Sequence, residues 1–131
     1  MLFKDYLDNK RELKTENRLA KYHKKIALEN EMAGIREFNN ACKIKGDPAR
    51  KNEWMENARI VVKEKYIYKA EIYYQYASDE YAFCVILAKT MGKKQKEIDK
   101  YKDLSKKYQE KSAEMKELFS HSYADLRKRI K

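Results

Sequence analysis

The middle third of the chain carries apolar residues at intervals of three and four, which is the spacing of one face of an α-helix. A second apolar row lies beside the first. Two adjacent rows predict a helix with a wide apolar face that neighbouring helices cover on two sides. The first row is Met55, Ala58, Val62, Tyr66, Ala70, Tyr73, Ala77, Tyr81, Cys84, Ala88 and Met91, and the second is Val61, Tyr68, Ile72, Tyr76, Phe83 and Leu87.

The segments on either side have narrower stripes on a strongly charged background. Each stripe again advances by threes and fours, so each segment is predicted to be a helix that is apolar on one side only. The first stripe is Leu19, Tyr22, Ile26 and Ala33, with Leu28, Met32, Ile35 and Cys42 alongside. The last is Ile98, Tyr101, Leu104, Tyr108, Met115, Phe119 and Leu126.

Helix-breaking residues are rare and stand where these segments meet. Gly46-Asp47-Pro48 combines a helix-ending glycine, an N-capping aspartate and a proline suited to the first helical position. Gly92 is the second stop. We therefore predict an all-α fold in a single helical domain, 1–131: an elongated antiparallel bundle of three long helices, at about 2–45, 48–91 and 93–130. Each helix would be about 60 Å long.

An alternative α+β fold arises from residues 66–76, where every even position is apolar, as in a strand. Residues 81–88 would then form the second strand of a hairpin across Ser78-Asp79-Glu80. Two features argue against this hairpin. The turn lacks glycine and asparagine, and the alanines at 70, 77, 82 and 88 disfavour strands.

Composition is consistent with a helical, cytoplasmic protein. Hydrophobic residues make up 43% of the 131 and charged residues 40%, with three glycines and one proline. The first residues lack the apolar stretch of a signal peptide, and the longest apolar run, 81–88, is too short to cross a bilayer. We expect no membrane association and two reduced, buried thiols at Cys42 and Cys84. For a protein of phage origin, the compartment would be the virion or the host cytoplasm.

The net charge of +10 is concentrated in the outer two segments. If residue n of the first helix lies level with n+92 of the third, their basic rows form one cationic surface suited to a phosphate backbone. Lysine enrichment from an AT-rich genome remains an alternative origin of this charge. The candidate basic face consists of Lys10, Lys14, Arg18, Lys21 and Lys25 on the first helix with Lys100, Lys107 and Lys111 on the third.

Catalytic patterns are not apparent. No glycine-rich phosphate loop is present, and neither His23 nor His121 follows a glutamate by three residues as helical di-iron sites require. His23 is expected to lie level with Glu71. We therefore expect no enzyme activity, no cofactor and no metal site.

Tyrosine is unusually abundant, with eleven in the chain and a cluster between positions 66 and 76. Most fit the apolar rows of the middle helix, but Tyr74 fits neither row and is expected to face outward. Tyrosine favours protein interfaces because it combines area, rigidity and a polar tip. The candidate protein interface is Tyr68, Tyr74, Tyr76 and Phe83.

The hypothesis that follows is a non-catalytic helical interaction or structural protein acting in a larger assembly, such as an adaptor, an assembly factor or a phage or mobile-element component. Its partner would be another protein, a second copy of itself, or both. The alternative is a sequence-independent nucleic-acid-binding protein that uses the basic faces of the first and third helices.

Overall fold

The computed structural model describes residues 3–44 and 53–130, with side chains at 3–4, 7–8, 10–11, 14–44 and 57–119. Three helices account for almost all of them: α1 (Phe3–Lys43), α2 (Glu53–Thr90) and α3 (Gln95–Ile130). The predicted all-α, three-helix fold is confirmed. The segments 66–76 and 81–88 both lie inside α2, so the alternative hairpin is wrong. The predicted hinge Gly46-Asp47-Pro48 falls outside the described residues.

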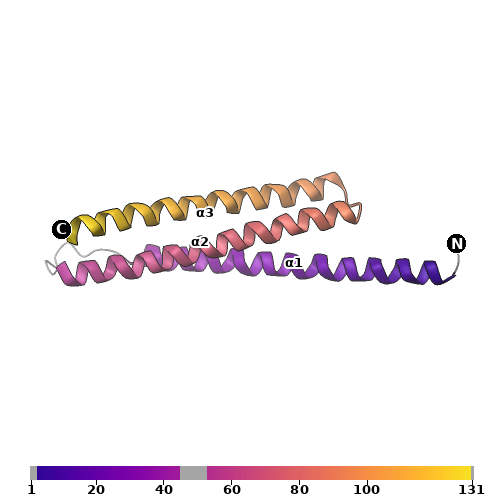
Figure 1. The fold of residues 1–131 in the computed structure, drawn as a ribbon, viewed down its shortest axis with the longest axis horizontal. Coiled ribbons are helices and arrows are strands. Elements are labelled where there is room, and N and C mark those ends of the chain that lie inside the picture. Colours follow the sequence, from indigo (N-terminus) through magenta and orange to yellow (C-terminus); the bar gives the residue numbers. More distant parts are fainter. Residues whose placement is uncertain (1–2, 45–52, 131) are drawn as a thin grey trace.

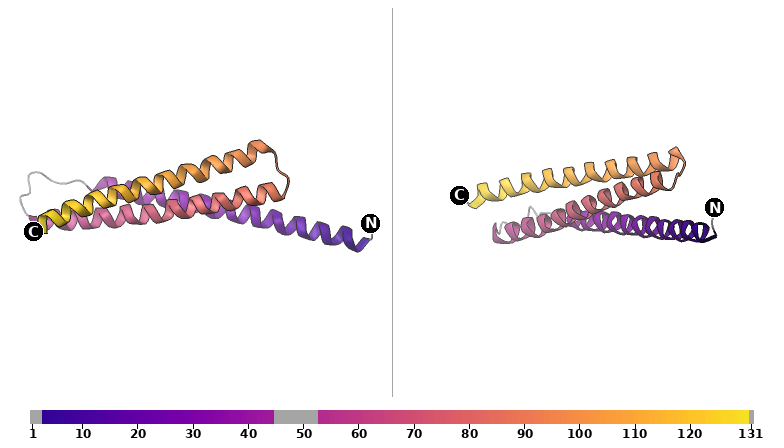
Figure 2. Two further views of the ribbon diagram at one scale, coloured as in Figure 1. Left: turned by 45° about the horizontal axis from the view of Figure 1, so that its top comes forward. Right: turned by 45° about the vertical axis from the view of Figure 1, so that its right-hand side comes forward.

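The helices run antiparallel in chain order, with α2 between the other two (Figure 1). Within the described part of the chain, α2 packs extensively against both α1 and α3, whereas the backbones of α1 and α3 approach each other only marginally. Figures 1 and 2 also show the N-terminal part of α1 running past the α2–α3 turn, with no other helix beside it. The fold is therefore an elongated and rather open bundle, with α2 as its central element.

Gly92 ends α2 through a glycine-dependent turn. Its φ of 66° lies in the left-handed region, the only such value among the described residues. The N–H of Lys93 donates to the carbonyl of Ala88 at 2.9 Å, and the N–H of Gly92 donates to that of Lys89 at 3.1 Å. These two bonds form a Schellman motif, which satisfies the last carbonyls of a helix. The chain then re-enters a helix at Gln95 and turns α3 back along α2.

The buried side of α2 follows a helical period. Five members of the first predicted row are buried, which explains why this segment is a helix despite its alternating tyrosines. Val62 of the first row is exposed, however, as are Val61, Tyr68, Tyr76 and Phe83 of the second. The prediction that both rows are covered is therefore wrong for the second row. The buried apolar residues of α2 are Ile67, Ala70, Tyr74, Ala77, Tyr81, Cys84 and Ala88.

The side of α1 that packs on α2 is not the stripe that the sequence predicts. The innermost positions are Ala27, Gly34 and Ala41, seven residues apart, and all three are buried. Small residues suit these positions because they let two helix backbones approach closely. The larger residues of the predicted stripe are displaced to the flanks, where Leu19, Tyr22, Leu28, Met32 and Ile35 remain exposed.

The apolar stripe of α3 is confirmed as far as its side chains are described, since Ile98, Tyr101, Tyr108 and Met115 are buried. Leu104 and Phe119 are partly buried against the same core, and the side chain of Leu126 lies outside the described residues. Serine hydroxyls then fix the position of α3 along the axis of α2. The Ser78 hydroxyl donates to the Ser105 carbonyl at 2.8 Å, and the Ser105 hydroxyl donates to the Ser78 carbonyl at 2.9 Å. These reciprocal bonds satisfy polar groups that would be costly to bury unpaired.

Candidate interaction surfaces

The most exposed apolar surface of α2 lies on the side away from its buried row. We call it the outer face of α2. Its large side chains are between 45% and 59% exposed. Exposed apolar side chains scattered singly need no explanation, but a series along one helix is typical of a contact site. The outer face comprises Val61, Val62, Tyr68, Tyr76, Phe83 and Ile86.

The outer face continues onto α1 through a small aromatic cluster. The His23 ring stacks on Phe83, with ring centroids 5.1 Å apart, and Tyr22 meets the His23 ring edge-on at 5.4 Å. The His23 Nδ1 also lies 2.5 Å from a carboxylate oxygen of Glu80. The partner of His23 is thus Glu80, and the expected level with Glu71 is wrong. The stacking on His23 holds the Phe83 ring in place, and about half of the Phe83 side chain remains exposed.

Tyr74 is not part of this surface, which corrects the predicted interface. The side chain is only 2% exposed, and its ring stacks on Tyr108 with centroids 5.8 Å apart. Gly34 on α1 makes this burial possible, because a Cβ there would stand 2.7 Å from the Tyr74 ring. Burial raises the pKa of the Tyr74 hydroxyl, and the nearby Glu114 carboxylate adds to the effect. Tyr68, Tyr76 and Phe83 remain as candidate interface residues.

A tyrosine–glutamate network joins all three helices inside the bundle. The Tyr81 hydroxyl of α2 donates to one Glu31 carboxylate oxygen at 2.6 Å, and the Tyr108 hydroxyl of α3 donates to the other. The Tyr81 and Tyr108 rings stack at 6.0 Å. Burial raises the pKa of both hydroxyls, and their bonds to Glu31 raise it further. Because charged acceptors make strong hydrogen bonds, this network aligns α1 with α3 across α2.

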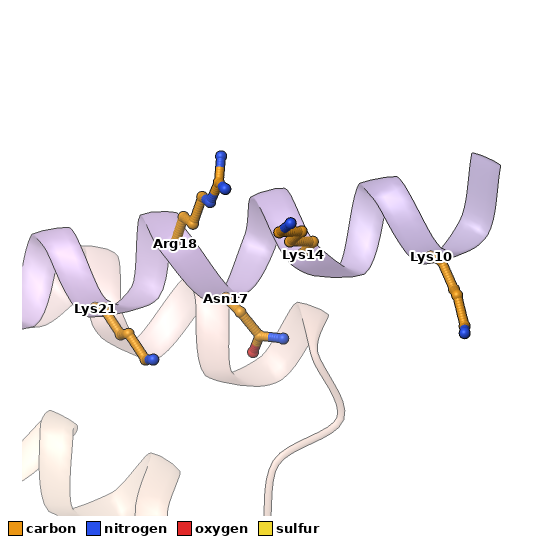
Figure 3. Close-up of a pocket in the computed structure, with 5 residues that line it drawn as sticks. All are labelled: Lys10, Lys14, Asn17, Arg18 and Lys21. Atoms are coloured by element: carbon orange, nitrogen blue, oxygen red, sulfur yellow. The ribbon is translucent and has the colours of Figure 1, made fainter. Parts of the chain in front are cut away.

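The basic residues of α1 lie on or near the part that extends past the turn. Lys10, Lys14, Arg18 and Lys21 are exposed and, with Asn17, line a hollow of about 340 Å³ along the helix. Arg18 points to one side of α1, and Asn17 and Lys21 point to the other (Figure 3). Lys25 is exposed one turn further on. Their spacing of three and four residues places the five charges within about 80° of the helix circumference, so they form one basic face on α1, with Arg18 and Lys21 toward its opposite edges.

The basic rows of α1 and α3 overlap less than predicted. The Glu31–Tyr108 bond joins residues 77 apart, so the offset between the helices is near 77 rather than 92. That offset places Lys100 level with His23 and Lys107 level with Asn30, beyond Lys10 and Lys14. Lys107 and Lys111 also extend their ammonium groups over the rings of Tyr108 and Tyr74, at 5.4 and 5.8 Å. Lys100, Lys107 and Lys111 therefore lie too far along the bundle axis from Lys10 and Lys14 to form one surface with the start of α1.

The cysteines differ in environment. Cys84 is buried, and desolvation raises the pKa of its thiol to about 11, with a further contribution from Glu80. Cys84 also lines a small cavity of about 30 Å³ near the turn, with Ala20, Ala88 and Tyr101 among its walls. Cys42 is exposed, so the expectation of a second buried thiol is wrong. The side chain of His121 lies outside the described residues.

Over the described part of the chain, no group of three or more histidine, cysteine, aspartate or glutamate side chains is placed to hold a metal ion. Within the same ranges, no helix has the length and apolar character needed to cross a membrane. Comparison of the chain with protein-family models, curated proteins and solved structures finds no match.

The residues that sequence reasoning missed are Glu31, Gly34 and the small residues beside it. A signal for the latter exists, because Ala20, Ala27, Gly34 and Ala41 recur every seven residues. Such a repeat is typical of a close helix–helix seam. Glu31 gives no comparable signal, since it reads as one more charge on an amphipathic helix.

Proposed function

We propose that this chain is a non-catalytic helical protein that works in the cytoplasm through protein–protein contacts within a larger assembly. The observation that carries the proposal is the outer face of α2, where large apolar side chains remain half-exposed along the central helix. Burial of such side chains against a partner would contribute about 25 cal/mol per Å² of apolar area. An adaptor, an assembly factor or a phage component fits this description.

The experiment that tests this proposal is capture of the tagged protein from its native cell after chemical cross-linking. We expect a protein in stoichiometric amount that resists nuclease treatment and is lost in the variants Tyr76→Ser and Phe83→Ser. Leu118→Ser is the matched control, because Leu118 is similarly exposed but lies on α3. Capture that is equally weak in the control, or that disappears with nuclease, would contradict the proposal.

Sequence-independent nucleic-acid binding is the second candidate, supported by the exposed basic residues along the extending part of α1. Phosphate contacts make such binding strongly salt-dependent. If it occurs, affinity for single- or double-stranded DNA should fall by at least tenfold between 50 and 200 mM salt, values chosen to bracket physiological ionic strength.

The charge-reversal pair Lys14→Glu/Arg18→Glu should reduce this affinity at low salt. Lys63→Glu/Lys89→Glu changes the net charge equally but acts on exposed lysines of α2, and should have a smaller effect. Absence of binding at 50 mM salt, or equal losses in both variants, would exclude the α1 surface as a nucleic-acid site.

A further inference from the structure

The exposed side of α2 has its own three–four repeat, distinct from the buried one. Successive residues turn by about 100°, so Tyr76 is rotated by about 200° from the buried Tyr74. Steps of three and four from Tyr76 define a line that we call the α2 seam. Of its large apolar members, Val62, Tyr76, Phe83 and Ile86 are exposed and Ile72 is partly buried. The seam is Val62, Lys65, Lys69, Ile72, Tyr76, Asp79, Phe83 and Ile86.

We propose that the α2 seam is the contact between two copies of this chain, packed antiparallel about a two-fold axis at the level of residue 74. Closed two-fold dimers use the same patch on both subunits, so the patch must be complementary to itself. About this axis the seam is self-complementary. Val62 faces Ile86 of the second copy, Ile72 faces Tyr76, and Lys69 faces Asp79.

The remaining pair places Lys65 opposite Phe83. A lysine stem packs well along apolar surface while its ammonium group stays near water or over an aromatic ring. Residue 79 is exposed, and one of its carboxylate oxygens accepts from the Gln75 amide at 3.0 Å. The second oxygen of Asp79 is the one that would accept from Lys69. Each of the four pairs therefore joins apolar to apolar, cation to anion, or cation to ring.

Charge explains why a second copy meets α2 rather than α1 or α3. The α2 segment carries five basic and six acidic residues, whereas α1 and α3 each carry ten basic and seven acidic. Two positively charged helices repel one another, but two copies of α2 do not. Glu80 is the one charged residue that flanks the seam between 61 and 87, and it already contacts His23 at 2.5 Å.

Geometry leaves room for this contact. The main contacts of α1 and α3 with α2 lie on the side that carries Tyr74, Tyr81 and Ala88, where Tyr81 also bonds to Glu31. At the edges of the seam, His23 of α1 stacks on Phe83, and Phe119 of α3 lies 5.9 Å from the Tyr68 ring. Phe83 and Tyr68 nevertheless remain half-exposed. The seam from Val62 to Ile86 is about 36 Å long. A pairing of that length, with knobs from one helix entering holes on the other, is comparable to a short antiparallel coiled coil.

The first test is solution mass by sedimentation equilibrium at about 100 µM, a concentration at which moderate interfaces are occupied. We expect twice the chain mass of 15.8 kDa. Asp79→Lys, and separately Lys69→Asp, should weaken the dimer at least tenfold by placing like charges opposite each other. The combined variant Lys69→Asp/Asp79→Lys reverses both charges and should restore it. A wild-type mass of 15.8 kDa, or a combined variant no better than the single ones, overturns the proposal.

The second test determines the register by cysteine cross-linking in a Cys42→Ser/Cys84→Ala background. A mixture of Val62→Cys and Ile86→Cys chains should form a disulfide-linked dimer under mild oxidation. Val62→Cys alone should not, because its two thiols would lie about 36 Å apart. A disulfide-linked dimer in the Val62→Cys variant alone would show a parallel pairing, and no disulfide in the mixture would show that Val62 does not face Ile86; either result overturns the antiparallel seam. Unchanged helical circular dichroism shows that each variant still folds.

This inference rests on the proposed function, because both take the exposed side of α2 to be a protein contact. The two nevertheless fail separately. A chain that stays at 15.8 kDa but captures a different protein through Phe83 overturns the second copy and leaves the proposed function intact. A dimer in the expected register, with no other protein captured, supports the α2 seam and contradicts the proposal that the chain acts in a larger assembly.

Discussion

Gly34 and Tyr74 meet where α1 packs against α2, and the missing side chain of the glycine leaves room for the buried ring. The Tyr74 ring fills the space where any other residue at 34 would put its Cβ. This contact decides that Tyr74 points inward, although its neighbours Tyr73 and Tyr76 do not reach the same depth. Glu31 likewise fixes the packing through a single side chain. Its two carboxylate oxygens accept hydrogen bonds from tyrosines of two different helices.

Gly34→Ala should destabilise the protein in spite of alanine's better helix propensity. The propensity gain is about 1 kcal/mol, but a Cβ 2.7 Å from a buried ring forces the ring to move, at a cost of about 1–3 kcal/mol. Urea denaturation would measure the net loss. In a Tyr74→Leu background the same change should be neutral or stabilising. A rise in stability in the wild-type background would show that the ring gives way freely.

Tyr108→Phe should lower the free energy of unfolding by about 1–3 kcal/mol, because it removes a hydrogen bond to the Glu31 carboxylate inside the bundle. Tyr81→Phe should have a similar effect. Tyr76→Phe is the control, since its hydroxyl belongs to a half-exposed side chain, and we expect a change below about 0.5 kcal/mol. Equal effects at all three positions would mean that the network does not contribute specifically.

At the scale of elements, each helix has a different reason for its place. The α1 helix packs through small residues at seven-residue spacing, which permit close approach to α2. The α3 helix packs through large tyrosines and is fixed in height by the reciprocal bonds of Ser78 and Ser105. The turn that joins α2 to α3 depends on a single left-handed residue, Gly92.

Gly92→Ala should therefore cost about 1 kcal/mol, because alanine is strained at a φ of 66°. No atom lies within 4 Å of a Cβ at this position, so changed packing does not contribute to the measured loss of stability. Gly92→Asn should cost less, since asparagine tolerates the left-handed region better. Thermal unfolding of both variants would check this order. An alanine variant as stable as the wild type would contradict the backbone account.

At the scale of the whole molecule, the bundle is an open array with a part of α1 extending beyond it (Figure 1). Its interior is rich in tyrosine hydroxyls rather than purely aliphatic. The buried tyrosines make the stability of the fold sensitive to alkaline pH, because several of their hydroxyls have a raised pKa in the folded state.

Stability should be independent of these hydroxyls below about pH 9 and should fall above about pH 10. In the unfolded chain the tyrosines ionise near their ordinary pKa of about 10, whereas burial in the folded state keeps Tyr81 and Tyr108 protonated to higher pH. Their contribution is thus present below the unfolded pKa and lost above it. The slope is about 1.4 kcal/mol per pH unit for each group.

Urea denaturation at a series of pH values from about 8 to 11 covers the onset of this loss, where the tyrosines of the unfolded chain ionise. The double variant Tyr81→Phe/Tyr108→Phe is the control, and its stability should fall less steeply because it lacks two of the titrating groups. If both proteins lose stability in parallel, general charge effects rather than these hydroxyls cause the loss.

The sequence by itself determined that the chain forms three long helices, that Gly92 ends the second, that charge gathers on the outer two, and which face of α3 is buried. These follow from helical periodicity and from the scarcity of residues that break helices. Only the tertiary structure decided which face of α1 turns inward, that the second apolar row of α2 stays exposed, that Tyr74 is buried, and that α1 and α3 are offset by 77 residues rather than 92. Periodicity fixes which residues share a face. Close approach at Gly34 and the hydrogen bonds of Glu31 fix which face packs and at what height.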